Sequence, residues 1–146
     1  MGEQIYWEDV SEGMELPVLV KHPTTRQLVQ YAGCSGDFYE IHYDKDFAQG
    51  NELDGVIIHG ALKNAFLGHF MTGWMGPLGV LKRLTCQYRG MDQPGSSISA
   101  KGSVTKKYEQ DGQHLVDCNI WLENQEAQKT TPGSATVALP SRKSPA

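Results

Sequence analysis

The sequence lacks a long hydrophobic run. No apolar stretch approaches the about 20 residues that a membrane-spanning helix needs, and a hydrophobic share of 39% is ordinary for a water-soluble domain. The first residues, MGEQIYWEDVSEGME, contain neither the basic segment nor the apolar segment of a secretory signal. We therefore expect a cytoplasmic protein that makes no contact with a membrane.

Cysteines are few, and metal-ligand spacings are missing. The three cysteines, Cys34, Cys86 and Cys118, are odd in number and far apart, and they form no C-x-x-C pair. The histidines and carboxylates never fall into a zinc-ligand spacing such as H-E-x-x-H. These absences predict reduced thiols and no metal site.

An excess of positive charge is also missing. The net charge is -4 at pH 7 and the isoelectric point is near 5.7, whereas a nucleic-acid-binding protein presents a basic face. We therefore expect no nucleic-acid partner. One local group of cations, Lys82, Arg83 and Arg89, would be enough to bind a phosphate-bearing small ligand. The alternative is that each of them lies on a solvated strand edge.

The length bounds the number of domains. A chain of 146 residues suits a single domain with one core, and it contains no internal repeat. We predict one domain over residues 1–146, with an N-terminal arm (1–14) and a frayed tail (141–146).

Capping residues and hydrophobic spacing predict the helices. Thr24 and Thr25 are the N-cap candidates, Gln27 lies in capping-box register with Thr24, and this first helix ends at Gly33. Asp44 caps a short helix, DKDFAQ. The longest helix follows Gly60, in ALKNAFLGHFMTGWMG, where large apolar residues recur at every fourth position: Leu62, Phe66, Phe70 and Trp74. We expect this helix to be buried on much of its circumference.

The second half of the chain changes to the period of strands. Apolar and polar residues alternate over residues 84–88, 98–104, 116–122 and 135–139, and an earlier strand is predicted over residues 15–20. Turn-rich links between these segments favour antiparallel neighbours. A long apolar helix followed by antiparallel strands that curl around it is an α+β arrangement. The unpaired edges of such a sheet predict a homodimer.

The segment SGDFYEIH, residues 35–42, contains the candidate catalytic pair Asp37 and His42. Each alone is more often structural, as a turn-capping aspartate or as a hydrogen-bonded core histidine. Together they provide the base and the acid that hydration of a conjugated double bond needs, because water loses a proton while the α-carbon gains one.

Two stretches, YAGCSGDFYEIHYDKDFA and the later GVIIHGAL, resemble the MaoC-like, or R-specific enoyl-CoA hydratase, family. The resemblance runs from Pro23 to Leu139. It implies the hot-dog fold, an α+β fold in which a curved antiparallel β-sheet wraps a long central helix. It also implies a hydro-lyase that needs no cofactor and converts an enoyl thioester of coenzyme A or an acyl-carrier protein into a 3-hydroxyacyl thioester.

The resemblance also assigns roles to residues. It implies that Asp37 is the base, that His42 is the proton donor, and that the Gly60 amide stabilises the charge on the thioester oxygen. An unsatisfied N–H at a helix N-terminus suits that last role. Tyr39 and Glu40 stand where the family has Asn-Pro, so the loop that holds the pair differs from the family pattern.

Several other residues receive weaker assignments. Candidates for substrate binding are His59, Tyr39, Lys82, Arg83 and Arg89. For His59 we favour a structural role in orienting the loop, and we expect His69 to be packed or to line a tunnel. We expect Lys63 to point to solvent. Three bulky residues near the end of the long helix are expected to complete the core or, alternatively, to form the floor of an acyl tunnel: Met71, Trp74 and Met75.

Two other functions remain open at this point. One is a non-catalytic hot-dog subunit that pairs with an active homologue and contributes surface to a binding tunnel. The other is an acyl thioesterase. The presence of Asp37 and His42 favours the hydratase, whereas Tyr39 and Glu40 leave room for the non-catalytic subunit.

Overall fold

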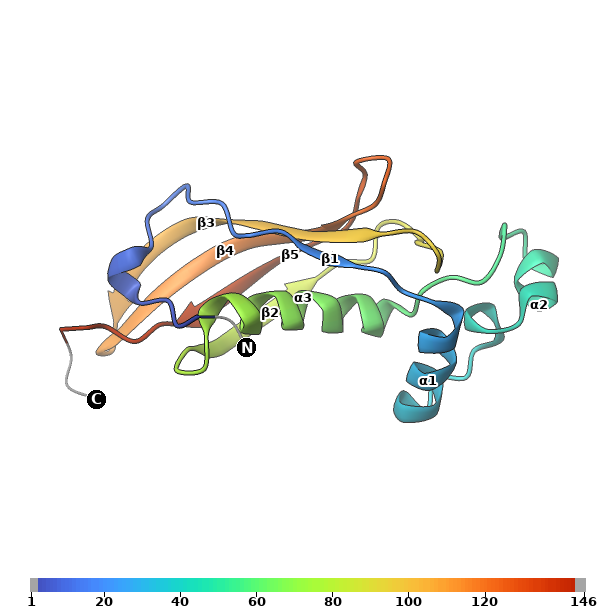
Figure 1. The fold of residues 1–146 in the computed structure, drawn as a ribbon, viewed down its shortest axis with the longest axis horizontal. Coiled ribbons are helices and arrows are strands. Elements are labelled where there is room, and N and C mark those ends of the chain that lie inside the picture. The colour runs from blue at the N-terminus through green and yellow to red at the C-terminus, as the bar shows by residue number, and fades with distance from the viewer. Residues whose placement is uncertain (1–2, 144–146) are drawn as a thin grey trace.

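The computed structural model describes residues 3–143. Figure 1 shows one long helix lying along a curved sheet, with shorter helices beyond one end of it. The elements in chain order are the 3-10 turn η1 (Trp7–Asp9), β1 (Leu19–Lys21), α1 (Thr25–Ser35), the 3-10 turn η2 (Glu40–His42), α2 (Lys45–Gly50), α3 (Gly60–Met75), β2 (Val80–Cys86), β3 (Ile98–Gln110), β4 (Gln113–Glu123) and β5 (Lys129–Ala138). Within the described range, no helix is both long enough and apolar enough to span a bilayer.

The five strands form one antiparallel sheet in the order β1-β3-β4-β5-β2. The four strands predicted in the second half of the chain are confirmed, although β3, β4 and β5 are longer than predicted and β2 begins and ends earlier. The strand predicted over residues 15–20 is displaced: β1 covers only Leu19–Lys21, and Glu15 makes an isolated bridge to Ser103. Pro17 lies between them, and a proline has no N–H for a strand ladder.

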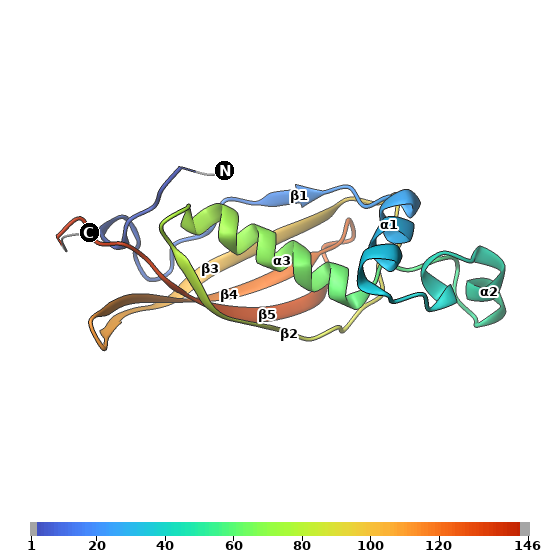
Figure 2. The ribbon, with the colours of Figure 1, turned by 90° about the horizontal axis from the view of Figure 1, so that it is seen from below.

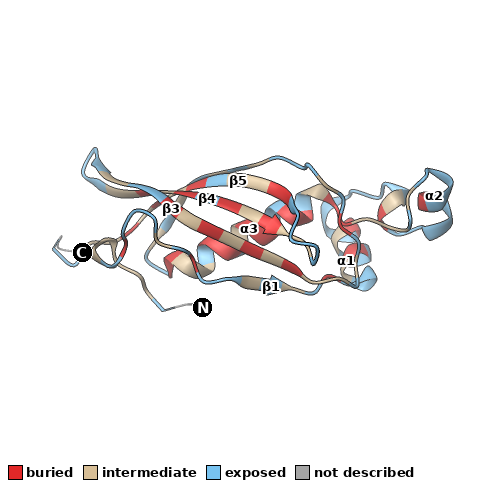
Figure 3. Ribbon diagram, turned by 90° about the horizontal axis from the view of Figure 1, so that it is seen from above, coloured by how far each residue is buried: buried red, intermediate tan, exposed pale blue. Residues whose placement is uncertain are grey.

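Helix α3 fills the concave face of the sheet, as Figure 2 shows. Its buried side chains include Phe66, Leu67, Phe70 and Met71. They meet the inward-facing residues of the sheet, and Figure 3 shows the alternation of buried and partly exposed positions along β3 and β4. One face of α3 is thus buried against the sheet, whereas five residues on the other face are exposed: Ala61, Asn64, Ala65, His69 and Thr72. The helix is therefore less enclosed than the sequence predicts.

The segment from α1 to α2 lies beyond the sheet, near the N-terminal end of α3 (Figures 1 and 2). The predicted caps are confirmed: Thr24 accepts a hydrogen bond from the Gln27 N–H, and Asp44 accepts one from the Phe47 N–H. The predicted end at Gly33 is wrong: α1 continues to Ser35, and Gly36 caps it with a φ of 78°, a conformation that glycine adopts without strain. We call residues 25–50 the overhang.

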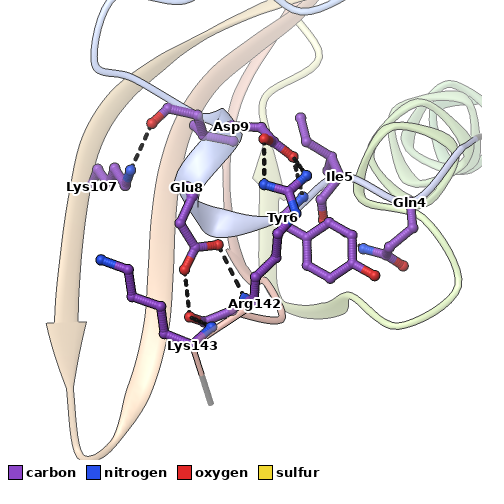
Figure 4. A network of polar contacts seen from close by, with 10 residues as sticks. Gln4, Ile5, Tyr6, Glu8, Asp9, Lys107, Arg142 and Lys143 are labelled. Carbon is purple, nitrogen blue, oxygen red and sulfur yellow. Dashed lines mark hydrogen bonds and ion pairs between the residues drawn. The ribbon is translucent and has the colours of Figure 1, made fainter. Parts of the chain in front are cut away.

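The two ends of the chain meet at the opposite end of the sheet. Arg142 donates two hydrogen bonds to the Asp9 carboxylate, both 2.7 Å long, and Glu8 accepts one from the Ser141 hydroxyl (Figure 4). The prediction of a frayed tail is therefore wrong for Ser141 and Arg142, while residues 144–146 lie outside the described part of the chain. We call Glu8, Asp9, Ser141 and Arg142 the terminal clasp.

Candidate active site

The overhang brings Asp37 and His42 together. The turn at Gly36 delivers Asp37 into an exposed position, whereas His42 lies in η2 and is only 7% exposed. The Oδ2 atom of Asp37 is 3.9 Å from the Nε2 atom of His42. This gap is too long for a direct hydrogen bond, but one water at about 2.8 Å from each atom can bridge it.

A backbone carbonyl fixes the orientation of the His42 ring. The Nδ1 atom of His42 is 2.8 Å from the Ile57 carbonyl oxygen. A carbonyl only accepts, so Nδ1 carries the proton and donates it. The other ring nitrogen, Nε2, therefore faces Asp37 and is the atom available for proton exchange.

His59 joins the two members of the pair. Its ring stacks on that of His42 with centroids 3.8 Å apart, and its Nε2–H donates to the Asp37 carbonyl oxygen at 3.2 Å. The side chain is fully buried, and burial together with the nearby His42 lowers the pKa of His59. A neutral His59 that orients both residues agrees with the structural role favoured from sequence.

Gly60 opens α3 directly after His59. An amide in the first turn of a helix has no acceptor within the helix, and the helix dipole favours negative charge at that point. A Cβ atom at this position would lie 2.9 Å from Cε2 of Tyr88, so a side chain would force the tyrosine ring to move. The structure thus places the predicted oxyanion donor beside the residue that contacts both Asp37 and His42.

Lys63 corrects a prediction. We expected it to point to solvent, but it is 2% exposed, and its ammonium group lies 2.6 Å from Oδ2 of Asp92 and 2.7 Å from the Gly90 carbonyl oxygen. Asp92 is also buried. No pattern in the sequence predicts this pair, because an aspartate in a loop belongs to no periodic pattern.

The predicted cation group is not a single cluster. Lys82 and Arg83 are exposed on β2, and Arg89 follows the end of that strand. Arg83 lies within β2, whereas Arg89 is three residues beyond the end of β2 at Cys86. Only Arg89 lies in the segment next to Gly60, where its side chain donates to the Gln87 side chain.

Tyr39 lies at the exposed rim of the pair. Its ring meets the edges of the His42 and Phe47 rings, with centroids 6.3 and 6.0 Å away. Tyr39 therefore borders the space where a substrate would approach Asp37 and His42.

Asp37, His42 and His59 also place ligand atoms within 4.8 Å of one another. The two imidazole planes are stacked at an angle of 20°. Because nitrogen lone pairs lie in the ring plane, these nearly parallel rings do not converge on one ion at the about 2.0 Å that zinc requires. The arrangement suits the sharing of a proton better than the binding of a metal.

A hollow of about 620 Å³ lies at the other end of α3, between β1 and the N-terminal arm. Its lining includes Trp74 and His69, and His69 accepts a hydrogen bond from Lys21 at 2.6 Å. Met71 and Met75 are buried in the core, as expected. This hollow does not contain any of the residues around Asp37 and His42.

Comparison with known families matches residues 11–124 to the MaoC like domain. The chain belongs to the MaoC-like family. A relative from Rhodospirillum rubrum, the (R)-specific enoyl-CoA hydratase, is 27% identical over 101 residues, which cover 68% of this chain and 69% of that protein. The family resemblance drawn from the sequence motifs is therefore confirmed.

Solved structures share the fold of this MaoC-like chain. The R-hydratase PhaJ1 from Pseudomonas aeruginosa has a TM-score of 0.85 and 21% identity over 95% of this chain and 88% of that chain. A chain of the ChsH1-ChsH2 complex from Mycobacterium tuberculosis has a TM-score of 0.77 and 19% identity over 88% of this chain and 98% of that chain. These likenesses confirm the predicted hot-dog fold.

Proposed function

We propose that this chain adds water to, or removes it from, the α,β double bond of an enoyl thioester carried by coenzyme A or an acyl-carrier protein. The observation that carries the proposal is the approach of Asp37 Oδ2 to His42 Nε2, 3.9 Å apart, beside the N-terminus of α3. Membership of the MaoC-like family and the similarity to an (R)-specific enoyl-CoA hydratase support it.

One bridging water accounts for the arrangement of the pair. Asp37 accepts a proton from this water while its oxygen bonds to the β-carbon of the substrate. His42, protonated at Nε2, delivers a proton to the α-carbon, so the product is a 3-hydroxyacyl thioester. The two side chains then exchange a proton through solvent, and dehydration follows the same path in reverse. Neither direction calls for a cofactor.

The charge that develops during this reaction collects on the thioester oxygen. In the proposed pose this oxygen accepts a hydrogen bond from the Gly60 amide, where the helix dipole adds to the stabilisation. The absence of a side chain at Gly60 leaves room for the Tyr88 ring beside the amide. His59 keeps Asp37 and His42 in position by stacking on the His42 ring and donating a hydrogen bond to the Asp37 carbonyl oxygen.

The test uses purified protein and crotonyl-CoA. We expect the absorbance of the enoyl thioester to fall without release of free thiol. Release of thiol would instead indicate an acyl thioesterase. A panel of enoyl thioesters with different acyl lengths, offered on coenzyme A and on an acyl-carrier protein, then defines the substrate.

A second candidate is a non-catalytic subunit of a hetero-oligomeric dehydratase. The similarity to a chain of the ChsH1-ChsH2 complex and the presence of Tyr39 and Glu40 favour it.

We propose a homodimer as the default assembly, because β1 and β2 end the sheet with unpaired edges. Light scattering at twice the 16.1 kDa of one chain supports it; a monomer that is inactive until a homologous subunit is added indicates the second candidate.

A further inference from the structure

We propose that the buried Lys63–Asp92 ion pair positions the catalytic pair, as an anchor between the sheet and the loop that holds His42. The inference rests on the proposed function for its effect on turnover, although its structural part can be tested without an activity assay. Neither Lys63 nor Asp92 touches the reacting atoms, so both are positioning residues.

The first half of the anchor connects the sheet to α3. The Thr130 hydroxyl, at the start of β5, donates to Oδ2 of Asp92 at 2.7 Å. The same carboxylate oxygen is 2.6 Å from the Lys63 ammonium group, which also donates to the Gly90 carbonyl oxygen. The Thr130 carbonyl oxygen accepts the N–H groups of Arg89 and Gly90. Segment 89–92 is therefore tied both to β5 and to the first turn of α3.

The second half connects this segment to His42. The Ile58 N–H donates to the Asp92 carbonyl oxygen at 2.8 Å, and the preceding residue, Ile57, accepts from Nδ1 of His42 at 2.8 Å. The Ile57 N–H donates to the Ile41 carbonyl oxygen at 3.0 Å, next to His42 in the chain. Contacts thus run without a gap from Thr130 to the catalytic histidine.

The free-energy cost of burying two charges makes a purely stabilising role a poor explanation for the Lys63–Asp92 pair. A buried ion pair loses hydration on both partners and is often no more stable than an apolar pair of the same size. The cation also lies in the first turn of α3, where the helix dipole opposes it. What the pair does provide is a fixed position for segment 89–92, Ile58 and the Gly60 end of α3.

Two neighbouring threonines on β5 give a matched test. Both Thr130 and Thr131 are buried, but the Thr131 hydroxyl has no hydrogen-bond partner among the described residues. Valine is close to threonine in shape and replaces the hydroxyl with a methyl group, so it removes the hydrogen bond. Thr130→Val is therefore expected to disturb the anchor, and Thr131→Val is the control.

The readout is the ring proton on Nδ1 of His42, followed by NMR in 15N-labelled protein. It is slow to exchange while it is held by Ile57. We expect Thr130→Val to shift this signal or speed its exchange, with a lower kcat and a nearly unchanged KM, and Thr131→Val to leave all three unchanged. An undisturbed signal and kcat in Thr130→Val would count against the anchor.

A double substitution removes the ion pair without leaving a buried charge. In Lys63→Met/Asp92→Asn the asparagine oxygen can still accept from Thr130, so we expect the variant to fold. We expect kcat to fall by about 10²-fold, the cost of a misplacement of about 1 Å, and the His42 signal to change. The control pair, Lys101→Met/Glu123→Gln, removes a cross-strand ion pair between β3 and β4 and should change neither.

The outcomes separate the two proposals. If the wild type hydrates no enoyl thioester, the proposed function fails, and the His42 signal alone still decides whether the anchor exists. If the double substitution keeps the wild-type signal and kcat, the anchor is overturned while the proposed function stands. If the double substitution does not fold, the comparison of Thr130→Val with Thr131→Val decides.

Discussion

Two ion pairs near opposite ends of the sheet lie in different surroundings. At the overhang end, the Lys63–Asp92 pair is buried, with side chains 2% and 3% exposed. At the other end, the Arg142–Asp9 pair of the terminal clasp is open to water, with side chains 53% and 39% exposed. Water screens the exposed pair but not the buried one. The buried charges therefore fix the positions of the groups around them, whereas the charges of the terminal clasp add little to the free energy of unfolding.

The largest effect is expected from breaking the buried pair on one side only. Lys63→Met leaves the Asp92 carboxylate buried without a partner, so we expect a loss of about 3–5 kcal/mol in the free energy of unfolding. Urea unfolding measures it. The double substitution Lys63→Met/Asp92→Asn should recover most of the loss; if the single and double variants are equally unstable, the pair is not the unit that matters.

Two substitutions at Gly60 distinguish the loss of its amide N–H from the effect of an added side chain. Gly60→Pro removes the N–H while keeping a backbone conformation suited to the first helical position. We expect turnover to fall by about 10²–10³-fold, the usual loss of an oxyanion donor. Gly60→Ala is the control, because its Cβ meets Tyr88 in the same way but its amide remains. Equal activity in the two variants would rule out the amide as the donor.

A falling pH should destabilise the surroundings of His59 and the terminal clasp at different pH values. Burial lowers the pKa of His59 below its ordinary value of about 6.5, so neutral His59 stabilises the fold above that pH and the contribution is lost as the pH falls through the lowered pKa. In the terminal clasp, the hydrogen bond from Ser141 lowers the pKa of Glu8 to about 2. Its contribution is present above the unfolded value of about 4.3 and is lost only toward pH 2.

NMR during an acid titration measures this order. We expect the signals of His59 to change first, and those of Ser141 and Arg142 to change only in the more acidic range. The opposite order, or a single transition for both ends, would contradict the contrast between the buried and the exposed regions.

The smallest effect is expected from the exposed pair. Arg142→Met removes both hydrogen bonds to Asp9, yet the free energy of unfolding should change far less than in Lys63→Met, and the difference should shrink further at high salt. The hydration rate should not change. Urea midpoints at low and high salt test the first point, and a large salt-independent loss would show that the terminal clasp is not merely a surface feature.

Local signals in the sequence predict much of this structure. The caps Thr24 and Asp44, the long helix after Gly60 and the alternating strands all depend on neighbours within a few residues, and all are confirmed. The motif around Asp37 and His42 also led to the correct family. The secondary structure of segments with a local pattern can be predicted without knowledge of the tertiary fold.

The sequence does not reveal contacts that only the assembled fold creates. His42 and His59 are 17 positions apart and stack only because η2 and the loop before α3 meet, and Lys63 finds Asp92 29 positions further along the chain. Lys63 is four residues before Leu67 and eight before Met71, on a buried face of α3, so helical spacing placed it in the core and only its charge led to the expectation of solvent. Buried polar pairs of this kind depend on tertiary topology, so neither periodicity nor motif spacing predicts them.

The central claim is that Asp37 and His42 act as one unit on one water. The measurement is kcat for enoyl-thioester hydration in Asp37→Asn, His42→Gln and the double variant, each checked for wild-type stability. We predict that each single change lowers kcat by at least about 10²-fold, and that the double variant is little worse than the worse single variant, because either loss already disables proton transfer. Full activity in both single variants, or losses that multiply in the double variant, would contradict the claim.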